Sequence, residues 1–370
     1  MKILLLTTHL DTGGIPVYVV SLARGLKRHG HDPVVLSNGG WMEKQLTEEG
    51  VPHIVVPCRT SSELNPKLWL KVFPRLLQAV REERPQLLHA HTRVTQVLGW
   101  AASLITQVPL VTTCHGLYKY RVGRRIFRCW GGSVMAISEP SMQRLVEQYK
   151  LAPPHQVALI WNGVDVEHFV QPPAPEKVEW FRQTNGLRGD PIIGGIARLS
   201  PVKGLEYFLQ AVPGLLKDFP RLQVLLVGDG PARKELVRLA YELGIAGHVV
   251  ISHPVEDTRV PMATMRAFVA PALEEGFGLS IVEAMAAGVP VIAANVGGPS
   301  RIIEHGRSGF LVPTRASASI GEAVRALLSD PALHARIAGA ARERARREFD
   351  MKRVVQQVEQ VYERWASNGS

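Results

Sequence analysis

Short apolar runs alternate along the chain with longer segments in which apolar residues recur every three to four positions. The runs predict strands and the longer segments predict helices. In the first half the predicted strands are Ile3–Leu6, Val34–Leu36, His53–Val56, Leu87–Ala90, Leu110–Thr113 and, as the last one, Val134–Ile137. The predicted helices run from the Gly13-Gly14 loop to about Gly30 and over Lys44–Glu49, Leu68–Arg84 and Val94–Ile105. This alternation indicates a parallel sheet with helices on both faces.

The same pattern then stops and begins again. Asn162-Gly163 is a turn signal, and the proline-rich stretch Gln171–Pro175 is not expected inside a helix or a sheet. The second series of strands covers Ile192–Ile196, Val224–Val227, Val249–Ile251, Ala267–Ala270, Val289–Ala293 and Phe310–Val312, and helices follow from about Ala332 to Trp365. We therefore expect an α/β fold with two Rossmann-like domains that face each other across a cleft. The predicted domains are residues 1–165 and 166–346, and a final helix over 347–370 could return to the first domain.

Composition restricts the class of protein. A chain of 370 residues is long for a single core, and 46% hydrophobic against 21% charged residues excludes a disordered chain. The apolar runs are too short to cross a bilayer. The start, Met1–Leu6, runs into polar residues without a cleavage site, so we expect a buried strand and not a signal peptide. The 3 cysteines have no metal-ligand spacing and suit a reducing cytoplasm.

The positive charge is concentrated in the first half. Residues 1–163 contain 19 Lys and Arg against 10 Asp and Glu, whereas the remainder contains 24 against 23. This asymmetry indicates an acidic partner for the first half, such as a nucleic acid, an anionic lipid or a phosphorylated substrate.

Two segments of the second half carry the strongest chemical signals. In one, Glu275 and Glu283 are separated by seven residues across a predicted strand-to-helix junction that contains two glycines. The second carboxylate is expected about two turns into the helix. In the other, a strand leads to Arg198, and Lys203 is expected to open the next helix. Two cations at the carboxyl end of a strand suit a pyrophosphate. Solvated surface charges and acidic residues near a helix start remain the alternative explanations.

Taken together, these motifs resemble those of the retaining GT-B glycosyltransferases of family 4, over nearly the whole chain. The matching segments are, in order, Gly13-Gly14, His89–His91, Thr113–Gly116, Ile137–Glu139, Asn162–Asp165, Gly195–Gly204, Val227–Pro231, Glu275–Glu283, Gly288–Ile292, Gly297-Gly298 and Gly306–Val312. One segment departs from the pattern: the family often has Glu shortly after the paired glycines, where this chain has Pro299-Ser300-Arg301. A donor contact or a capping role at that position is therefore in doubt.

The resemblance implies a role for each matching residue. Arg198 and Lys203 would neutralise the donor diphosphate, and backbone N–H groups of Gly13 and Gly14 would approach it. Glu283 would bind the ribose, and His115 would lie near the reacting carbon. Further donor contacts are implied for Glu275 with Phe277, Gly278 and Leu279 around the transferred sugar, and for the backbone near Val255 at the base. Neither a cofactor nor a catalytic metal is expected, since cations and helix dipoles can stabilise the leaving group.

Histidines and cysteines leave other interpretations open. His89 and His91 alternate on a strand and should point the same way, so a zinc site is conceivable, although no third ligand is evident. His115 could also be only a hydrogen-bonded turn residue. Cys114 is adjacent to it in a strand and should face the opposite side, which argues against a thiol nucleophile.

The basic first half bears on the acceptor. Lys67, Lys71 and Arg75 recur every four residues on a predicted helix, and Tyr118–Arg121 leads to Arg124, Arg125, Phe127, Arg128 and Trp130. Basic residues among aromatic ones suit an anionic membrane surface or a nucleic acid, and a helix with one core-facing and one solvated side explains them equally well.

The predicted function is that of a metal-independent retaining hexosyltransferase. Its donor would be a nucleotide sugar, with UDP favoured. Its acceptor would be a hydroxyl group of a cell-surface glycan or of a lipid-linked, phosphorylated or other small molecule, and the product would have an alpha linkage. We expect a cytoplasmic protein that could associate with the inner face of the membrane. A nucleotide-sugar 2-epimerase or a sugar phosphorylase of the same fold is the alternative. A nucleic-acid-binding protein is disfavoured, because no recognition motif of that class is present.

Overall fold

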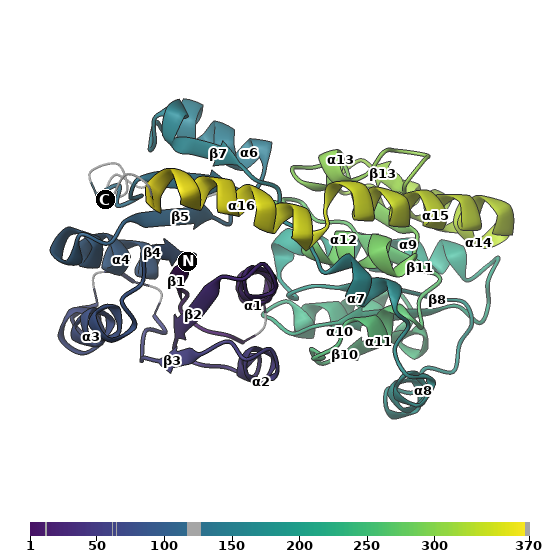
Figure 1. The fold of residues 1–370 in the computed structure, drawn as a ribbon. Helices are drawn as coiled ribbons and strands as arrows, with labels where there is room; N and C mark the ends of the chain where they lie inside the picture. Colours follow the sequence, from purple (N-terminus) through teal and green to yellow (C-terminus); the bar gives the residue numbers. More distant parts are fainter. Residues whose placement is uncertain (12, 61, 64, 117–126, 367–370) are drawn as a thin grey trace. The chain divides into compact units, whose positions relative to one another are not determined.

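The computed structural model describes residues 1–370 except 12, 61, 64, 117–126 and 367–370. The chain divides into two compact units (Figure 1). Unit 1 comprises residues 1–163 and 351–370, and unit 2 comprises residues 164–350. The polypeptide therefore passes through unit 2 and then returns to unit 1.

Unit 1 is built on one parallel sheet whose described strands have the order β3-β2-β1-β4-β5-β6-β7. The strands are β1 Lys2–Leu6, β2 Asp32–Ser37, β3 His53–Val55, β4 Leu87–Ala90, β5 Leu110–Cys114, β6 Ser133–Ala136 and β7 Val157–Leu159. Its helices are α1 Gly14–Arg28, α2 Glu43–Glu48, α3 Phe73–Glu83, α4 Arg93–Thr106, α6 Glu139–Gln143 and α16 Met351–Ala366. Three shorter helical segments are η1 Leu68–Val72 before α3, η2 Arg144–Gln148 and η3 Pro154–Gln156.

Alternating residues of β1 explain why this sheet is covered on both faces. Ile3 and Leu5 belong to a core with residues of α1 and α16, whereas Leu4 and Leu6 belong to a core with residues of α3 and α4. All four side chains are fully buried or nearly so. Successive strand residues point to opposite faces, so a continuous apolar strand needs helices on both sides.

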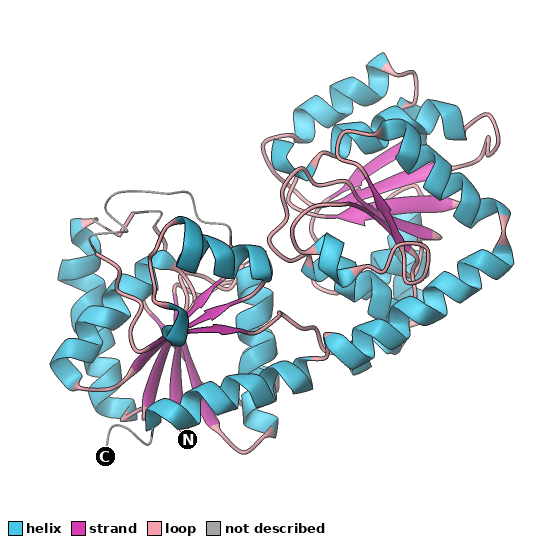
Figure 2. Cartoon of the chain, turned by 90° about the horizontal axis from the view of Figure 1, so that it is seen from above, coloured by secondary structure: helices cyan, strands magenta, loops and turns pink. Residues whose placement is uncertain are grey.

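Unit 2, all of whose residues are described, contains a second parallel sheet with the order β10-β9-β8-β11-β12-β13. Its strands are β8 Ile192–Ile196, β9 Gln223–Val227, β10 Val249–Ser252, β11 Ala267–Ala270, β12 Val291–Ala294 and β13 Phe310–Val312. Its helices are α7 Val166–Val170, α8 Pro175–Thr184, α9 Leu205–Leu215, α10 Arg233–Glu242, α11 Arg259–Met262, α12 Leu279–Ala287, α13 Pro299–Ile302, α14 Ser317–Ser329 and α15 Pro331–Glu348, with short turns η4 Pro201–Lys203 and η5 Ala246–His248. Figure 2 shows each sheet surrounded by its own helices.

The sequence-based prediction of two α/β sheets is confirmed, with two local errors. Val134–Ile137 is not the last strand of the first sheet, because β7 Val157–Leu159 pairs in parallel with β6. Three residues are too few for a clear apolar pattern. The stretch up to Pro175 is also not wholly outside helices, since Pro175 is the first residue of α8. Proline is tolerated there because the first helical N–H has no partner within the helix.

The net charge of the chain belongs entirely to unit 1. Its residues, α16 included, carry 22 Lys and Arg against 12 Asp and Glu, and unit 2 carries 21 against 21. No helix in the described residues is long and apolar enough to cross a membrane.

Candidate functional site

In unit 2 the candidate donor residues lie on loops that follow the carboxyl ends of the strands. The loop after β8 carries Arg198, which is exposed. Two glycines of the loop after β9 lie directly against it: a Cβ on Gly228 would come within 1.9 Å of the carbonyl oxygen of Ala197, and one on Gly230 within 2.3 Å of that of Leu199. Only glycine allows this approach. Gly228-Asp229-Gly230 therefore fixes the shape of the loop that presents Arg198.

The two cations of the predicted clamp have different surroundings. Within the described residues, no carboxylate forms an ion pair with Arg198, whereas the ammonium group of Lys203 pairs with the carboxylate of Glu275. Lys203 does not open the next helix as expected. It ends the turn η4, and Gly204, with a φ of 61°, separates it from α9. A cation and a carboxylate that the sequence assigned to different parts of a donor are thus in contact.

The loop after β11 that carries Glu275 is held by the paired glycines after β12. The N–H of Gly298 donates to the carbonyl oxygen of Glu275 at 3.1 Å. A Cβ on Gly297 would lie 2.0 Å from that oxygen, and one on Gly298 would lie 2.2 Å from the carbonyl oxygen of Phe277. The segment after them, Pro299–Ile302, forms the short helix α13 with no side-chain cap. The paired glycines thus support the loop of Glu275 by close packing.

The rest of this loop leads into α12. Phe277 is buried and its ring lies edge-on to Phe349, with ring centroids 5.9 Å apart. Gly278 is the N-cap of α12, has a φ of 106° and makes no side-chain cap, and Leu279 is the first helical residue. The backbone N–H groups at such a helix start have no partner within the helix and favour anionic or hydroxyl ligands.

Glu283 lies in the second turn of α12, closer to its start than the two turns expected from the sequence. Its side chain is buried, and the hydroxyl group of Thr258 donates to its Oε2 at 3.3 Å. Burial is the main reason that the pKa of Glu283 is raised to about 7; the Thr258 hydrogen bond opposes this shift and the charge of the nearby Asp257 adds to it. Glu283 is therefore a carboxyl group that titrates near neutral pH.

The two residues that act on Glu283, Thr258 and Asp257, were not found by sequence reasoning. Asp257 accepts a bidentate pair of hydrogen bonds from Arg259, with distances of 2.9 and 2.7 Å. Burial favours the neutral form of Asp257, but Arg259 outweighs it and lowers the pKa of Asp257. The guanidinium group also donates to the carbonyl oxygen of His168 at 3.1 Å. Loop residues without a motif give no signal for such contacts. Val255, expected near the base, lies partly exposed in the same loop after β10.

A small hollow lies between the ends of β8 and β11, with Lys203 and Glu275 in its lining. Its volume is about 20 Å³. A single water molecule needs about 10–15 Å³ on this measure. The hollow lined by the ion pair is therefore too small for a sugar.

In unit 1 a group of histidines lies at the carboxyl edge of the sheet. His91 follows β4 and His115 follows β5, and Nδ1 of His91 lies 3.0 Å from Nε2 of His115. His89 and His91 point the same way, as the strand pattern predicts, with ring centroids 4.0 Å apart. Nε2 of His91 is buried and has no hydrogen-bond partner among the described residues. The motifs of two strands thus converge on one site.

Burial makes these histidines poor bases. It lowers the pKa of His115 to about 3, and burial together with neighbouring imidazoles lowers the pKa of His89 to about 3 and that of His91 well below its usual value. All three rings are therefore neutral at physiological pH. Hydrogen bonds hold His89 in place, to the hydroxyl groups of Tyr362 at 2.6 Å and Thr113 at 2.7 Å.

The Gly13-Gly14 loop lies at the same edge. Gly13 has a φ of 135°, Gly14 begins α1, and both are exposed. Tyr18, one turn further along α1, has its ring edge-on to His115, with ring centroids 4.8 Å apart. Tyr18 was missed because it fits the apolar periodicity of α1. In the described residues no group of three or more His, Cys, Asp or Glu side chains is placed to hold a metal ion.

Part of the predicted acceptor surface is described. Lys67, Lys71 and Arg75 are exposed on η1 and α3, and so are Trp69 (38%) and Leu70 (76%). Leu68 and Val72 instead face the core. Residues 118–121, with Arg124 and Arg125, lie outside the described residues. Arg128 and Phe127 are exposed, whereas Trp130 is buried.

Two Rossmann-like sheets in one chain, each with charged or polar groups at its carboxyl edge, define the GT-B class of enzymes. The family model of glycosyl transferases group 1 matches residues 176–344, and that of glycosyltransferase family 4 matches residues 12–168. A D-inositol 3-phosphate glycosyltransferase of Streptomyces avermitilis is 30% identical, over 90% of this chain and 80% of the relative.

Solved structures agree with this assignment. Anabaena HepE in complex with UDP-glucose is similar with a TM-score of 0.84 and 25% identity, covering 98% of this chain and 100% of the other. A glycosyltransferase of Rickettsia africae has a TM-score of 0.84 and 23% identity, covering 99% of both chains. The chain belongs to the group 1 glycosyltransferases of GT-B fold, which the sequence motifs had indicated.

Proposed function

We propose that this protein transfers a hexosyl group from a nucleotide sugar, with UDP-sugars favoured, to a hydroxyl group of its acceptor. The observation that carries the proposal is the exposed Arg198 on the loop that leads to Lys203, whose ammonium group pairs with Glu275, at the carboxyl edge of the unit 2 sheet. A diphosphate would be an anionic partner for Arg198 and would replace Glu275 as the partner of the Lys203 ammonium group. The complex of Anabaena HepE with UDP-glucose supports the choice of nucleotide.

In this arrangement, different residues would bind different parts of the donor. When Lys203 turns to the phosphate, the carboxylate of Glu275 is released to accept hydrogen bonds from hydroxyl groups of the sugar. Backbone N–H groups of Phe277, Gly278 and Leu279 would lie beside that sugar, and those of Gly13 and Gly14 beside the phosphate. Glu283 would bind the ribose and Val255 the base. A carboxylate accepts only, so it suits ligands rich in hydroxyl donors.

The proposed chemistry relies on fixed positive charge. Arg198, Lys203 and the start of α12 would stabilise the departing diphosphate, so no divalent metal is required. His115 is neutral over the working pH range and would donate or accept one hydrogen bond near the reacting carbon. We propose retention of configuration and an alpha linkage, on the strength of the motifs shared with family 4.

The acceptor proposal rests on unit 1. Its excess of cations suits a phosphorylated acceptor or an anionic membrane that carries a lipid-linked one, and one relative is named for D-inositol 3-phosphate. The exposed Lys67, Lys71, Arg75, Trp69 and Leu70 would support contact with the inner face of a membrane. Three buried free cysteines suit a reducing cytoplasm.

The test is a UDP-release assay with UDP-glucose, UDP-N-acetylglucosamine and UDP-galactose, each with and without acceptors that include inositol phosphates and a polyprenyl-phosphate sugar. Acceptor-dependent release that persists in EDTA and yields an alpha-linked product by NMR is the expected result. Consumption of donor without any acceptor would indicate an epimerase, and dependence on inorganic phosphate would indicate a phosphorylase; either would contradict the proposal.

A further inference from the structure

A cavity in unit 1 lies at the opposite edge of the sheet from the histidines. Its volume is about 400 Å³, and its lining includes residues immediately before β5, β6 and β7. It therefore lies at the amino ends of these strands, while His91 and His115 lie at the carboxyl ends. A space of this size is within the range of small-molecule sites.

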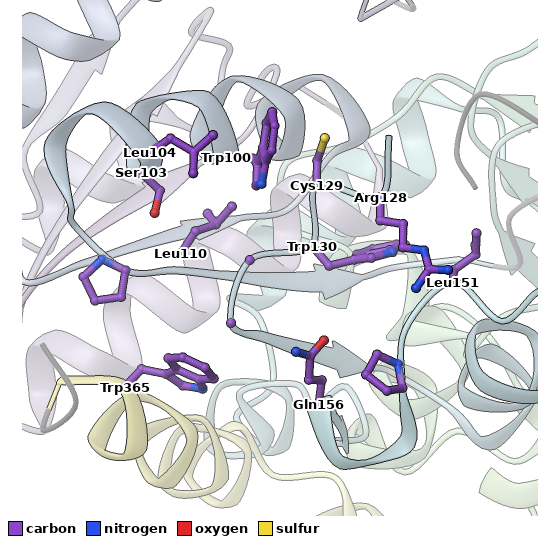
Figure 3. A pocket seen from close by; sticks show the side chains of 14 residues that line it. Trp100, Ser103, Leu104, Leu110, Arg128, Cys129, Trp130, Leu151, Gln156 and Trp365 are labelled. Atoms are coloured by element: carbon purple, nitrogen blue, oxygen red, sulfur yellow. The ribbon is translucent and has the colours of Figure 1, made fainter. Parts of the chain in front are cut away.

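Three tryptophans from separate elements converge on this cavity. Trp100 comes from α4, Trp130 from the segment before β6, and Trp365 from the end of α16 (Figure 3). Trp100 is 37% exposed, so part of its indole is free to contact a ligand. Three of the 7 tryptophans of the chain thus line a single cavity. Their flat rings offer apolar faces at a low cost in conformational entropy.

The walls of the cavity are held in place before any ligand binds. Arg93 and Gln96 of α4 donate to the carbonyl oxygen of Arg128 at 3.1 and 2.9 Å, and Thr112 donates to that of Trp130 at 2.9 Å. A Cβ on Gly132 would lie 2.5 Å from the ring of Trp365, so this ring packs directly on the backbone. A preformed site loses less entropy when it binds.

Polar side chains also line the cavity. Ser103 comes from α4, and Gln156 comes from the segment immediately before β7 (Figure 3). In the described part of the chain, the side chains of Ser103, Gln156 and Arg128 make no hydrogen bond. Donors and acceptors on several walls match the hydroxyl groups around a sugar ring, whose C–H face can rest on an indole. A nucleobase presents its polar atoms along fewer edges.

The charge of the lining residues indicates whether a neutral or an acidic sugar would bind. Arg128 is the one cation among the described residues that line the cavity, and no Asp or Glu is among them. An alkyl chain would leave the amide of Gln156 and the hydroxyl of Ser103 without partners in an apolar contact, which is costly. We propose that this cavity is a second carbohydrate site, which binds one acidic sugar residue of a glycan. The choice of a glycan rests on the proposed function, since the site would retain an acceptor or product chain away from the transfer site.

Calorimetry and tryptophan fluorescence with trigalacturonate test this proposal, with maltotriose as the neutral probe and with UDP either absent or saturating. We expect trigalacturonate to bind more tightly than maltotriose. Trp100→Ala should weaken trigalacturonate binding about tenfold, and Ser103→Ala several-fold. Arg128→Gln should bring both trisaccharides to similar affinity. Trp180→Ala, in unit 2 and 66% exposed, is the control that should change nothing.

Three results would overturn the proposal: no binding of trigalacturonate, equal binding by wild type and Trp100→Ala, or Trp100-dependent binding of dodecyl phosphate or UDP without binding of the sugar. The first would leave UDP binding in unit 2 unaffected, so a failure of this site is separable from a failure of the proposed donor site.

Discussion

Glu283 combines deep burial with one hydrogen-bond donor among the described residues, Thr258. Its pKa of about 7 in the folded protein is above its ordinary value of 4.5, so the folded state binds more protons than the unfolded state between these two values. The free energy of unfolding therefore falls as pH rises from 4.5 to 7 and stays reduced above pH 7. The ionised carboxylate therefore lowers the free energy of unfolding, and hydrogen bonds from the hydroxyl groups of a ligand could offset this loss.

Glu283→Gln tests whether the ionised carboxylate destabilises the fold. The variant keeps a similar shape without the charge, so it should be more stable than wild type at pH 8, by up to about 3 kcal/mol, and similar to it near pH 4.5. Urea unfolding at several pH values measures the difference, with the exposed neighbour Glu274→Gln as the control that should show none. Equal effects of both substitutions at pH 8 would contradict the assigned pKa.

Substitutions of Glu275 and Glu283 should have different effects on donor binding and transfer. Glu283→Ala should weaken UDP binding even without a sugar, because its proposed partner is the ribose. Glu275→Ala should preserve or improve UDP binding, since it frees Lys203, but should slow transfer. Calorimetry with UDP and with the intact donor separates the two roles. The same loss of UDP affinity in both variants would show that the division is wrong.

At the scale of elements, the helix formed by η1 and α3 separates a buried side from a basic side. Leu68, Val72 and Leu76 are buried, while Lys67 and Lys71 are exposed next to Trp69. The four-residue spacing of the cations could be predicted from the sequence. The outward position of Trp69 could not, because Trp69 falls in the π-helical turn Leu68–Val72, where the helical period changes.

Neutralising Lys67, Lys71 and Arg75 to Gln should weaken binding to anionic liposomes at low salt by roughly tenfold or more, because each cation near such a surface contributes to attraction. The attraction should fade at physiological salt, where the Debye length is about 8 Å. The control changes Lys177, Lys217 and Lys234 of unit 2 to Gln, an equal change in net charge. An equal loss of liposome binding in both triple variants would refute membrane contact by this helix. So would wild-type binding to neutral vesicles that equals its binding to anionic vesicles.

The C-terminal helix α16 is an integral part of unit 1. Val355 and Val358 are fully buried in its core, Val355 packs against Gly25 of α1, and Tyr362 bonds to His89 of β4. The amphipathic pattern predicts the helix itself. Its packing partner is set by contacts between residues more than 270 positions apart in sequence, which no local pattern encodes.

Tyr362→Phe should therefore destabilise unit 1 by about 1–2 kcal/mol, because it leaves a buried nitrogen of His89 without its partner. UDP affinity should stay the same, since the donor residues of unit 2 are not touched. Tyr241→Phe, at 72% exposure, is the matched control. A loss of UDP affinity in Tyr362→Phe without a loss of stability would contradict this independence.

At the scale of the whole molecule, the succession of strands and helices along the chain and the placement of the motifs after strands followed from the sequence, because apolar strands and glycine loops are local signals. Three contacts could not be predicted in this way: the ion pair of Lys203 with Glu275, the hydrogen bond from Thr258 to Glu283, and the contact of His91 with His115. Each joins side chains from different strand ends, so each depends on the order of strands in the sheet. The sequence could place these residues at one edge but could not choose their partners.

The central claim is that unit 2 binds a nucleoside diphosphate through Arg198 and Lys203. Calorimetric titration of UDP tests it most directly. Arg198→Ala and Lys203→Ala should each weaken UDP binding by roughly 10- to 100-fold, the range for a lost charge-assisted hydrogen bond, with the fold intact by circular dichroism. Arg188→Ala, an exposed arginine before β8 at the opposite end of the strand, should bind UDP like wild type. Wild-type affinity in both Arg198→Ala and Lys203→Ala would contradict the account.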